Sequence, residues 1–304
     1  MPNAGYTFVD LVPSGCDGIC VLDYYARRHV RADRDQWSLR IESGRVTRDG
    51  RVLACQDMLH TGDRLEYSRP PWDEPDVPME APILHEDPDV VVFHKPAGLP
   101  VNPGSGCQDR TLLTLARSRF GPEIRSVHRL DTGTSGAVAF ARSAVAARHL
   151  CAAFAARQVH KTYLAIVAGL GLPDKLVLDL PIGLVAYPPL GFVSGVSVDG
   201  RQAFSEVAVL RRDPASDQSL VQVIIATGRS QQIRVHLAWA GFPLAGDSLY
   251  GPGGTRPPVA GKPVPKPGDG GFLLHAWKLS LPRRTSTDRI EVVAAPPQAM
   301  EPVP

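Results

Sequence analysis

A proline-rich, acidic stretch divides the chain into two parts of unequal length. Residues 69–78 read Arg-Pro-Pro-Trp-Asp-Glu-Pro-Asp-Val-Pro. Because proline lacks an amide donor and disfavours a helical conformation in the residue before it, no helix or central strand can run through this stretch. We therefore predict an extended linker over residues 69–82, a small domain over residues 1–68 and a larger domain over residues 83–304.

The larger part mixes strands and helices without a regular strand–helix repeat, which predicts an α+β fold. We expect strands at residues 90–93, 161–169, 205–210, 220–226 and 273–281, and helices at residues 111–120, 144–158 and 232–240. Residues 251–271 are rich in Gly and Pro. We expect them to form an exposed, flexible loop whose deletion leaves the fold intact.

One carboxylate stands among small and hydroxyl residues in residues 128–136, His-Arg-Leu-Asp-Thr-Gly-Thr-Ser-Gly. The apolar residues 137–141 follow and indicate a buried strand. Asp131 should therefore lie on a tight loop at the mouth of a strand, where reactive side chains are often presented. A purely structural interpretation is also open, in which Asp131 caps the turn and Arg129 neutralises it.

Three further blocks accompany this one: residues 95–98 read Lys-Pro-Ala-Gly, residues 161–163 read Lys-Thr-Tyr, and residues 228–237 read Gly-Arg-Ser-Gln-Gln-Ile-Arg-Val-His-Leu. Together they resemble the RluA-type family of RNA pseudouridine synthases, whose signature His-Arg-Leu-Asp-x-x-Thr-Ser-Gly is filled at every fixed position. The resemblance implies the pseudouridine synthase fold, a mixed, mostly antiparallel central sheet flanked by helices and loops. Gln231 stands where the family usually has His, which could alter substrate preference.

The resemblance also implies roles for individual residues. Asp131 would be the reacting carboxylate, Arg234 its cationic partner, and Tyr163 would lie against the uracil and assist removal of the C5 proton. Whether the carboxylate attacks C1′, attacks C6 or promotes a glycal route stays open. The expected substrate-binding and RNA-binding residues of this domain are His128, Arg129, Arg229, Gln232, Ile233 and Lys95. Among these, Arg129 would stack in the place of the extruded base, and Lys95 would be structural or face a phosphate.

Isomerisation of uridine needs no redox change, metal ion or external nucleophile. The sequence carries no Walker-type loop and no dinucleotide fingerprint. Its five cysteines form no pair of Cys-x-x-Cys units. We therefore expect no cofactor, no metal and free thiols in a reducing compartment.

The first part of the chain resembles the S4-like RNA-binding module over residues 20–68. We expect helices at residues 21–31 and 37–43, followed by short strands within residues 44–52 and 59–67. Between positions 27 and 51 there are eight arginines and four acidic residues, and we expect Arg27, Arg28 and Arg45 to contact RNA. The alternative is a small accessory domain with ordinary surface arginines.

The expected partner is structured RNA. Within the family an S4-like extension goes most often with large-subunit ribosomal RNA, so rRNA is preferred over tRNA. A non-catalytic RNA-binding or ribosome-assembly factor that keeps the fold is the competing hypothesis. No apolar run is long enough to span a membrane and the N-terminus lacks a secretory pattern, so we expect a cytoplasmic monomer without a membrane partner.

Overall fold

The computed structural model describes residues 2–29, 32–104 and 106–302. The chain divides into two compact units, Met1–Pro75 and Asp76–Pro304. The division falls inside the proline-rich stretch, where the described residues 70–82 form no helix or strand. None of the described helices is both long and apolar enough to cross a membrane.

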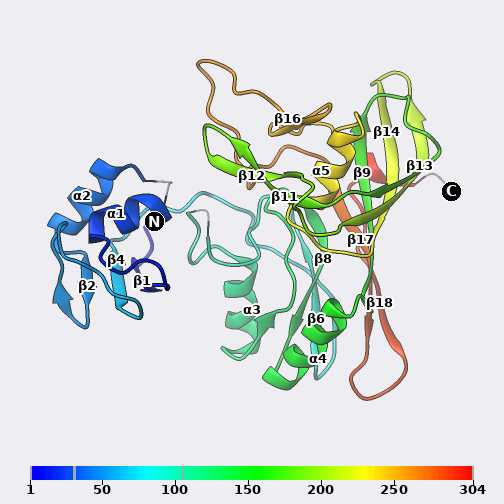
Figure 1. Ribbon diagram of the computed structural model, residues 1–304. Coiled ribbons are helices and arrows are strands. Elements are labelled where there is room, and N and C mark those ends of the chain that lie inside the picture. The colour runs from blue at the N-terminus through cyan, green and yellow to red at the C-terminus, as the bar shows by residue number, and fades with distance from the viewer. Residues whose placement is uncertain (1, 30–31, 105, 303–304) are drawn as a thin grey trace. The chain divides into compact units, whose positions relative to one another are not determined.

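The first unit contains an antiparallel sheet in the order β1-β4-β2-β3 and two helices (Figure 1). Its elements are β1 Tyr6–Leu11, α1 Val21–Arg28, α2 Arg34–Glu42, β2 Val46–Arg48, β3 Arg51–Val52 and β4 Arg64–Arg69. Helix α2 begins three residues earlier than predicted because Asp33 caps it by accepting the N–H of Gln36. The predicted end of the first helix, at residue 31, lies outside the described residues.

The second unit is built on one sheet that, within the described residues, has ten strands. Its main path runs β10-β13-β14-β9-β17-β8-β6-β5, with β18 paired to β17 and β7 to β8. The strands are β5 Ile83–Glu86, β6 Val90–Lys95, β7 Arg125–Ser126, β8 Ser135–Ala141, β9 His160–Ala168, β10 Lys175–Asp179, β13 Phe204–Asp213, β14 Gln218–Ile225, β17 Leu274–Pro282 and β18 Arg289–Val293. Among these described strands, β8 and β17 form the one parallel pair. The predicted α+β class and mostly antiparallel sheet are confirmed.

Helices cover both faces of this sheet. They are α3 Leu112–Phe120, α4 Ala144–Ala155 and α5 Gln232–Trp239, followed by a 3-10 turn η1 Gln298–Met300. Residues of α3 and α5 share one apolar cluster with Val138 and Phe140 of β8, whereas α4 packs with Ala137 and Ala139 in another. Strand β8 is therefore buried on both faces, which explains why its sequence is continuously apolar.

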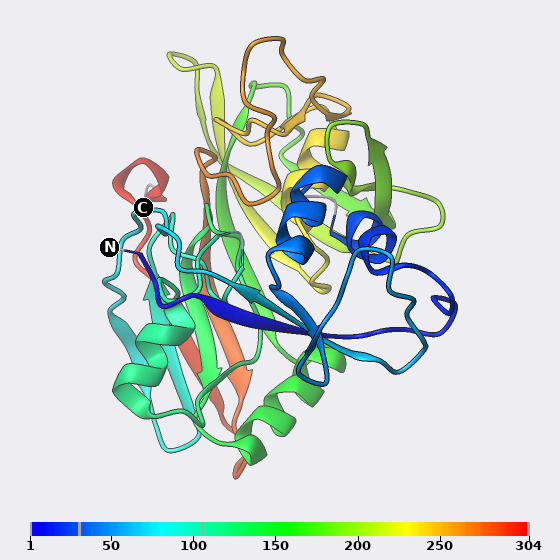
Figure 2. The same cartoon turned by 90° about the vertical axis from the view of Figure 1, so that its left-hand side faces the viewer.

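Two small hairpins complete the unit beside α5. One joins β11 Ile182–Tyr187 to β12 Gly191–Val196, and the other joins β15 Tyr250–Gly251 to β16 Gly254–Thr255. Figure 1 shows β11, β12 and β16 next to α5, and turning the molecule in Figure 2 keeps these elements together at one end of the unit. Helices α3 and α4 lie toward the other end in both views. The end that carries α5 also carries the candidate site.

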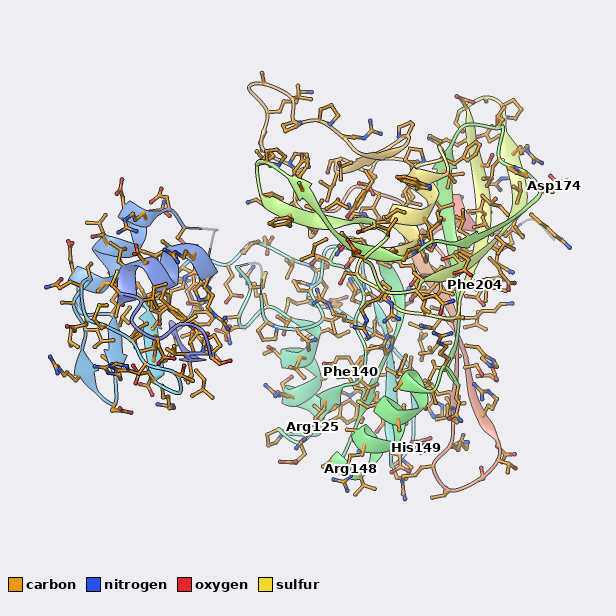
Figure 3. The ribbon with its side chains drawn as sticks, viewed as in Figure 1. Arg125, Phe140, Arg148, His149, Asp174 and Phe204 are labelled. Carbon is orange, nitrogen blue, oxygen red and sulfur yellow. The ribbon has the colours of Figure 1, made fainter. Side chains whose placement is uncertain are left out.

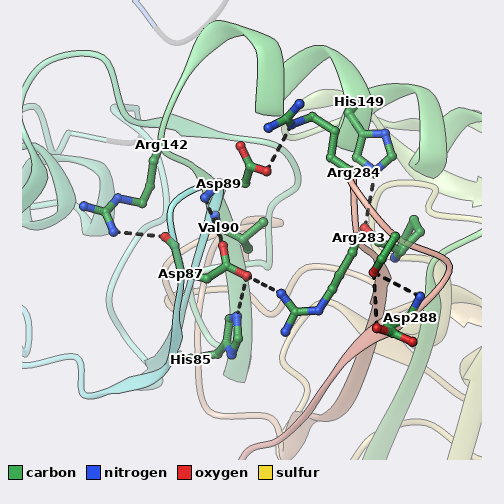
Figure 4. A network of polar contacts seen from close by, with 11 residues as sticks. His85, Asp87, Asp89, Val90, Arg142, His149, Arg283, Arg284 and Asp288 are labelled. Carbon is green, nitrogen blue, oxygen red and sulfur yellow. Dashed lines mark hydrogen bonds and ion pairs between the residues drawn. The ribbon is translucent and has the colours of Figure 1, made fainter.

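The turn between β5 and β6 is tied to the turn between β17 and β18 by charged side chains (Figure 4). Asp87 accepts from Arg283 at 2.9 Å and from His85 at 3.0 Å, and Asp89 accepts from Arg284 at 3.0 Å. These contacts fix two hairpin ends that are about 200 residues apart in sequence. They brace the end of the sheet that is remote from α5.

Candidate active site

A cleft of about 590 Å³ opens at the end of the sheet where α5 begins. Its walls come from the 127–134 loop, the end of α4, strand β9, the loop that leads into β13 and the segment from the end of β14 into α5. The charged side chains that line it are Arg129, Asp131, Arg157, Lys161, Arg201, Arg229 and Arg234. Among the described lining residues, Asp131 is thus the sole carboxylate, facing six cations.

Cross-strand register brings the separated sequence blocks together. Ala276 of β17 pairs with Gly136 of β8 on one side and with Tyr163 of β9 on the other. A side chain at Gly136 is excluded, because a Cβ there would lie 2.2 Å from the carbonyl oxygen of Ala276. The loop that carries Asp131 therefore enters the sheet two strands away from Tyr163.

The loop itself is held by short contacts. The N–H of Thr134 donates to the carbonyl oxygen of Asp131 at 3.0 Å, and the N–H of Gly98 donates to that of Thr132 at 2.7 Å. At Gly133 a Cβ would lie 2.8 Å from the Cα of Gly270, so this position requires glycine. The backbone of the Asp131 loop is fixed before any substrate binds.

Burial raises the pKa of the Asp131 carboxyl, and the nearby charges of Arg234 and Arg129 oppose this rise. Arg234 Nη1 lies 3.9 Å from Asp131 Oδ2. Gln231 Nε2 donates to Asp131 Oδ1 at 3.4 Å, so the residue that replaces the usual family histidine contacts the carboxylate directly. The predicted proximity of Asp131 and Arg234 is therefore present, but the ion pair is long.

Arg234 is bound first of all to Asp247. Its Nε donates to Asp247 Oδ2 at 2.7 Å and its Nη2 donates to Oδ1 at 2.9 Å, a two-pronged contact in which both side chains are buried. Its Nη1 donates to the carbonyl oxygen of Pro267 at 2.7 Å, and the guanidinium lies 4.2 Å from the ring centre of Phe272. Sequence reasoning did not select Asp247 as a site residue, although the Gly246-Asp247 pair in a Gly-Asp-x-x-Tyr-Gly block could have indicated it.

Residues 251–271 have the expected exposure and also contact the site. This segment is exposed along most of its length, but it also supplies β16 and an acceptor for Arg234. Arg256 Nε in addition donates to the carbonyl oxygens of Asp247 and Tyr250. A deletion of the whole segment would therefore remove an acceptor of Arg234, the neighbour of Asp131, and its effect on the fold stays a prediction.

Tyr163 lies in the wall of the cleft with 7% of its surface exposed. Burial, together with the negative charge of Asp131, raises the pKa of its phenol. An anionic phenolate is thus disfavoured beside Asp131, which weakens the expectation that Tyr163 removes the C5 proton as a base. Its neutral ring is suited to lie against a planar base.

Lys95 was expected to be structural or to face a phosphate, and its contacts agree with the structural option. It is fully buried, and its Nζ donates to the carbonyl oxygens of Pro96, Leu99 and Thr132 at 2.7–3.1 Å. Burial lowers the pKa of Lys95 to about 7. Because its donors point to the backbone, Lys95 supports the Asp131 loop and does not form part of an RNA-binding surface.

Gln232 was expected to bind substrate, but its amide is occupied within the protein. Its Oε1 accepts from Thr227 Oγ1 and from the N–H of Arg229, and its Nε2 donates to Phe204 and Ser205. The side chain is 3% exposed. Gln232 therefore joins the 227–229 loop to β13 and is a structural residue.

His128 also turns inward. Its Nε2 accepts the N–H of Ala139 at 2.9 Å, and its ring lies 4.9 Å from that of Phe154. Burial lowers the pKa of His128 to about 3, so the ring is neutral. This bond fixes the signature block against β8, and because His128 also lines the cleft, its role in substrate binding stays a prediction.

The remaining expected residues of this unit line the cleft. Ile233 is buried in its apolar wall, and Arg229 is half-buried with its Nε donating to the carbonyl oxygen of Gln202 at 3.0 Å. Arg129 is exposed, and none of the described side chains or backbone groups forms a hydrogen bond or ion pair with it. Arg129 is thus available to an incoming ligand.

The three arginines expected in the first unit differ in surroundings. Arg28 lies 3.6 Å from Asp10, which partly neutralises it, and its guanidinium also lies over Tyr24. Arg27 is exposed in the last turn of α1, and Arg45 is half-buried before β2. Arg27 therefore offers the most accessible positive charge of the three.

Metal-binding groups are not seen in the described part of the chain. No group of three or more His, Cys, Asp or Glu side chains within it could hold an ion, and all five cysteines are free.

Comparison with known proteins decides the family. A family model described as RNA pseudouridylate synthase matches residues 89–239. An uncharacterized RNA pseudouridine synthase of Synechocystis sp. is 37% identical over 93% of this chain and 96% of its own length. The chain belongs to the RNA pseudouridine synthases. This synthase is therefore an isomerase that acts on RNA, as the sequence motifs predicted.

The synthase is also similar to a named relative and to a solved structure. Ribosomal large subunit pseudouridine synthase D of Pseudomonas aeruginosa is 37% identical over 76% of this chain and 72% of its own length. The solved structure of human RNA pseudouridylate synthase domain containing 1 matches with a TM-score of 0.59 and 26% identity, over 75% of this chain and 89% of that one. The architecture described above is thus the pseudouridine synthase fold.

Proposed function

We propose that Asp131 is the carboxylate that carries the isomerisation of uridine in this synthase. The observation that supports it most is that, among the described residues lining the cleft, no other carboxylate faces the six cations. The reaction breaks the bond between C1′ of the ribose and N1 of uracil and joins C1′ to C5. N1 gains a proton and C5 loses one, so the product is an isomer and no co-reactant is needed.

The neighbours of Asp131 fit this assignment. Arg234 and Gln231 both reach the carboxylate and favour its ionised form, which burial alone would disfavour. Tyr163 would hold the uracil by contact with its face. Arg129 would occupy the space that the uridine leaves when it is turned out of its stack, because it is exposed and lies two residues before Asp131.

We propose large-subunit ribosomal RNA as the substrate of the synthase. The support is the relative from P. aeruginosa, whose name gives the large ribosomal subunit and which matches 76% of this chain. Pseudouridine mapping of total RNA by carbodiimide-dependent primer extension, in cells with and without the gene, tests this proposal. Loss of one or a few sites in large-subunit rRNA is expected, whereas loss confined to tRNA would contradict the choice of rRNA.

We also propose that the first unit is an S4-like RNA-binding module and that the synthase works as a cytoplasmic monomer. The support for the module is its pair of short helices followed by three of the four strands of a small sheet, with exposed Arg27 at the end of α1. A gel-shift titration of the full chain with rRNA should show weaker binding for Arg27→Ala. Unchanged binding of this variant would favour an accessory role for the unit.

Gln231→Ala is expected to move the acid limb of the pH–rate profile to higher pH. Gln231 donates to Asp131, and this bond lowers the pKa of a carboxyl that burial raises. Because Asp131 is needed in its ionised form, the synthase is active only above the pKa of this carboxyl. Loss of the Gln231 donor raises that pKa further. A net hydrogen bond of this kind corresponds to a roughly threefold to tenfold fall in rate at acidic pH.

Single-turnover rates measured across the acid range test this expectation, with Gln298→Ala as the control. Gln298 is exposed in η1 and does not line the cleft. An acid limb that coincides in the Gln231 variant, the control and the wild type would show that the amide has no influence on the carboxylate.

A further inference from the structure

Three arginines from separate segments meet at the candidate active-site cleft. Arg157 follows α4, Arg201 precedes β13 and Arg229 precedes α5, and all three line the cleft. Burial lowers the pKa of Arg229, and the positive charges of Arg201 and Arg157 lower it further. The charges of Arg157 and Arg201 thus both act on the Arg229 guanidinium, and all three side chains line one cleft.

Asp131 lines the same cleft, but no carboxylate of the described residues is paired with these three arginines. Across the described ranges, no ion pair involves Arg157, Arg201 or Arg229. Arg229 Nε donates to the carbonyl oxygen of Gln202. Arg157 and Arg201 are exposed. Like charges held together without a counter-ion favour binding of an anion at that place.

The backbone at Arg157 gives an independent reason to assign its side chain a function. Arg157 has a φ of 58°, in the left-handed region, directly after Ala156 at the end of α4. Its N–H donates to the carbonyl oxygen of Phe154, and the N–H of Gln158 donates to that of Ala153. Glycine is usual at such a position because it lacks the steric penalty of a Cβ. Arg157 therefore places an arginine side chain on the cleft at a position where glycine would be less strained.

The other two arginines are also held in place by their backbones. The N–H of Arg201 donates to the carbonyl oxygen of Ile182, whose own N–H donates back to that of Arg201. Arg229 is fixed through its N–H, which donates to Gln232 Oε1. Lys161 adds a further cation to the cleft, and its Nζ donates to the carbonyl oxygen of Thr227. The backbones that carry the three arginines are thus fixed by hydrogen bonds.

We propose that Arg157, Arg201 and Arg229 form a binding site for a phosphodiester of the RNA strand that enters the cleft. Planar guanidinium groups bind phosphate oxygens with paired hydrogen bonds, and a ligand with one negative charge per nucleotide supplies the missing counter-ion. This inference rests on the proposed function of the cleft. The site would anchor the strand while the uridine is turned toward Asp131.

The Arg157→Gly variant tests whether the Arg157 side chain binds phosphate or only supports the fold. Glycine relieves the left-handed strain, so the melting temperature should stay equal or rise. Binding of a fluorescein-labelled oligouridine RNA should weaken about tenfold, and the slope of log affinity against log salt should fall by about 0.7 to 0.9. An oligouridine with uncharged methylphosphonate linkages should bind the variant and the wild type equally.

Arg148→Ala is the matched control, because Arg148 is an exposed arginine of α4 that does not line the cleft. Figure 3 shows it well away from Phe204, the residue whose N–H bonds Thr227 near Arg229. The control should leave both affinity and salt slope at the wild-type values. Arg201→Gln should reproduce the weaker binding of Arg157→Gly and guards against an unexpected fold defect in that variant.

Wild-type affinity and salt slope in both Arg157→Gly and Arg201→Gln would overturn the proposal. So would an equal loss of binding on the methylphosphonate strand, because the arginines would then recognise something other than phosphate charge. These binding measurements do not depend on turnover. If the wild-type protein fails to form pseudouridine in any RNA while the charge-dependent loss persists, the phosphate site stands and the proposed function fails.

Discussion

Asp131→Asn should abolish formation of pseudouridine, with single-turnover rates at least ~10⁴-fold below those of the wild type, the scale seen when a reacting group is removed. Asparagine keeps the shape of the side chain but carries no negative charge. The six cations of the cleft then face no carboxylate among its described lining residues. Chromatography of digested RNA after incubation with the purified variant measures the loss directly.

The same substitution is not expected to reduce stability. Burial raises the pKa of Asp131 in the folded state above its unfolded value, so the folded protein binds the proton more tightly. Stability therefore decreases as pH rises through the interval between the two values, and at neutral pH the ionised side chain opposes folding. Removing the charge should leave the melting temperature at pH 7 equal or higher.

Asp174→Asn removes a carboxylate whose side chain is 84% exposed at the edge of the same unit (Figure 3), and it should keep full activity. The non-catalytic hypothesis requires a different result. If Asp131→Asn still forms pseudouridine at the wild-type rate, or if wild type and variant are equally inactive on all RNA, Asp131 is not the catalytic carboxylate.

Local patterns in the sequence predicted those parts of the fold that short-range chemistry determines. The start of α3 follows from Thr111, whose hydroxyl accepts the N–H of Thr114, and α4 begins in the same way at Ser143. The apolar residues 137–141 predicted a buried strand, which β8 confirms. By contrast β1 was not predicted, because it is an edge strand with exposed side chains and no alternation of polar and apolar residues.

Neither the pairing of strands far apart in the chain nor the direction of polar side chains could be predicted from the sequence. The register that aligns Gly136, Ala276 and Tyr163 joins strands far apart in the chain, and no local pattern encodes it. Likewise a polar residue in a motif can face a ligand or the protein interior. Gln232 was expected to bind substrate, but its amide is buried and bonded internally, and of the two roles expected for Lys95 its contacts agree with the structural one.

Asp247→Asn is expected to destabilise the protein by about 3–5 kcal/mol, because it removes the carboxylate that is bonded directly to a buried guanidinium and leaves only the long ion pair with Asp131. Asp247 is fully buried and binds Arg234 through both carboxylate oxygens. It also accepts the N–H groups of Leu249 and Tyr250, each at 2.9 Å. An asparagine can keep the acceptor for these N–H groups, but its amide NH₂ would face the guanidinium. The substitution therefore isolates the charge of Arg234 with little change of shape.

Urea unfolding of the full chain measures this effect, and Asp174→Asn again offers the comparison. The pair formed by Asp174 and Arg212 is of the same chemical kind but exposed, and removing it should reduce stability by less than about 1 kcal/mol. Each variant loses one carboxylate that is paired with one arginine. The difference between their losses of unfolding free energy therefore measures the effect of burying the pair. If Asp247→Asn is no less stable than Asp174→Asn, water or another group must compensate Arg234. The support that Arg234 gives to Asp131 would then come from the charge of Arg234 alone and not from its fixation by Asp247.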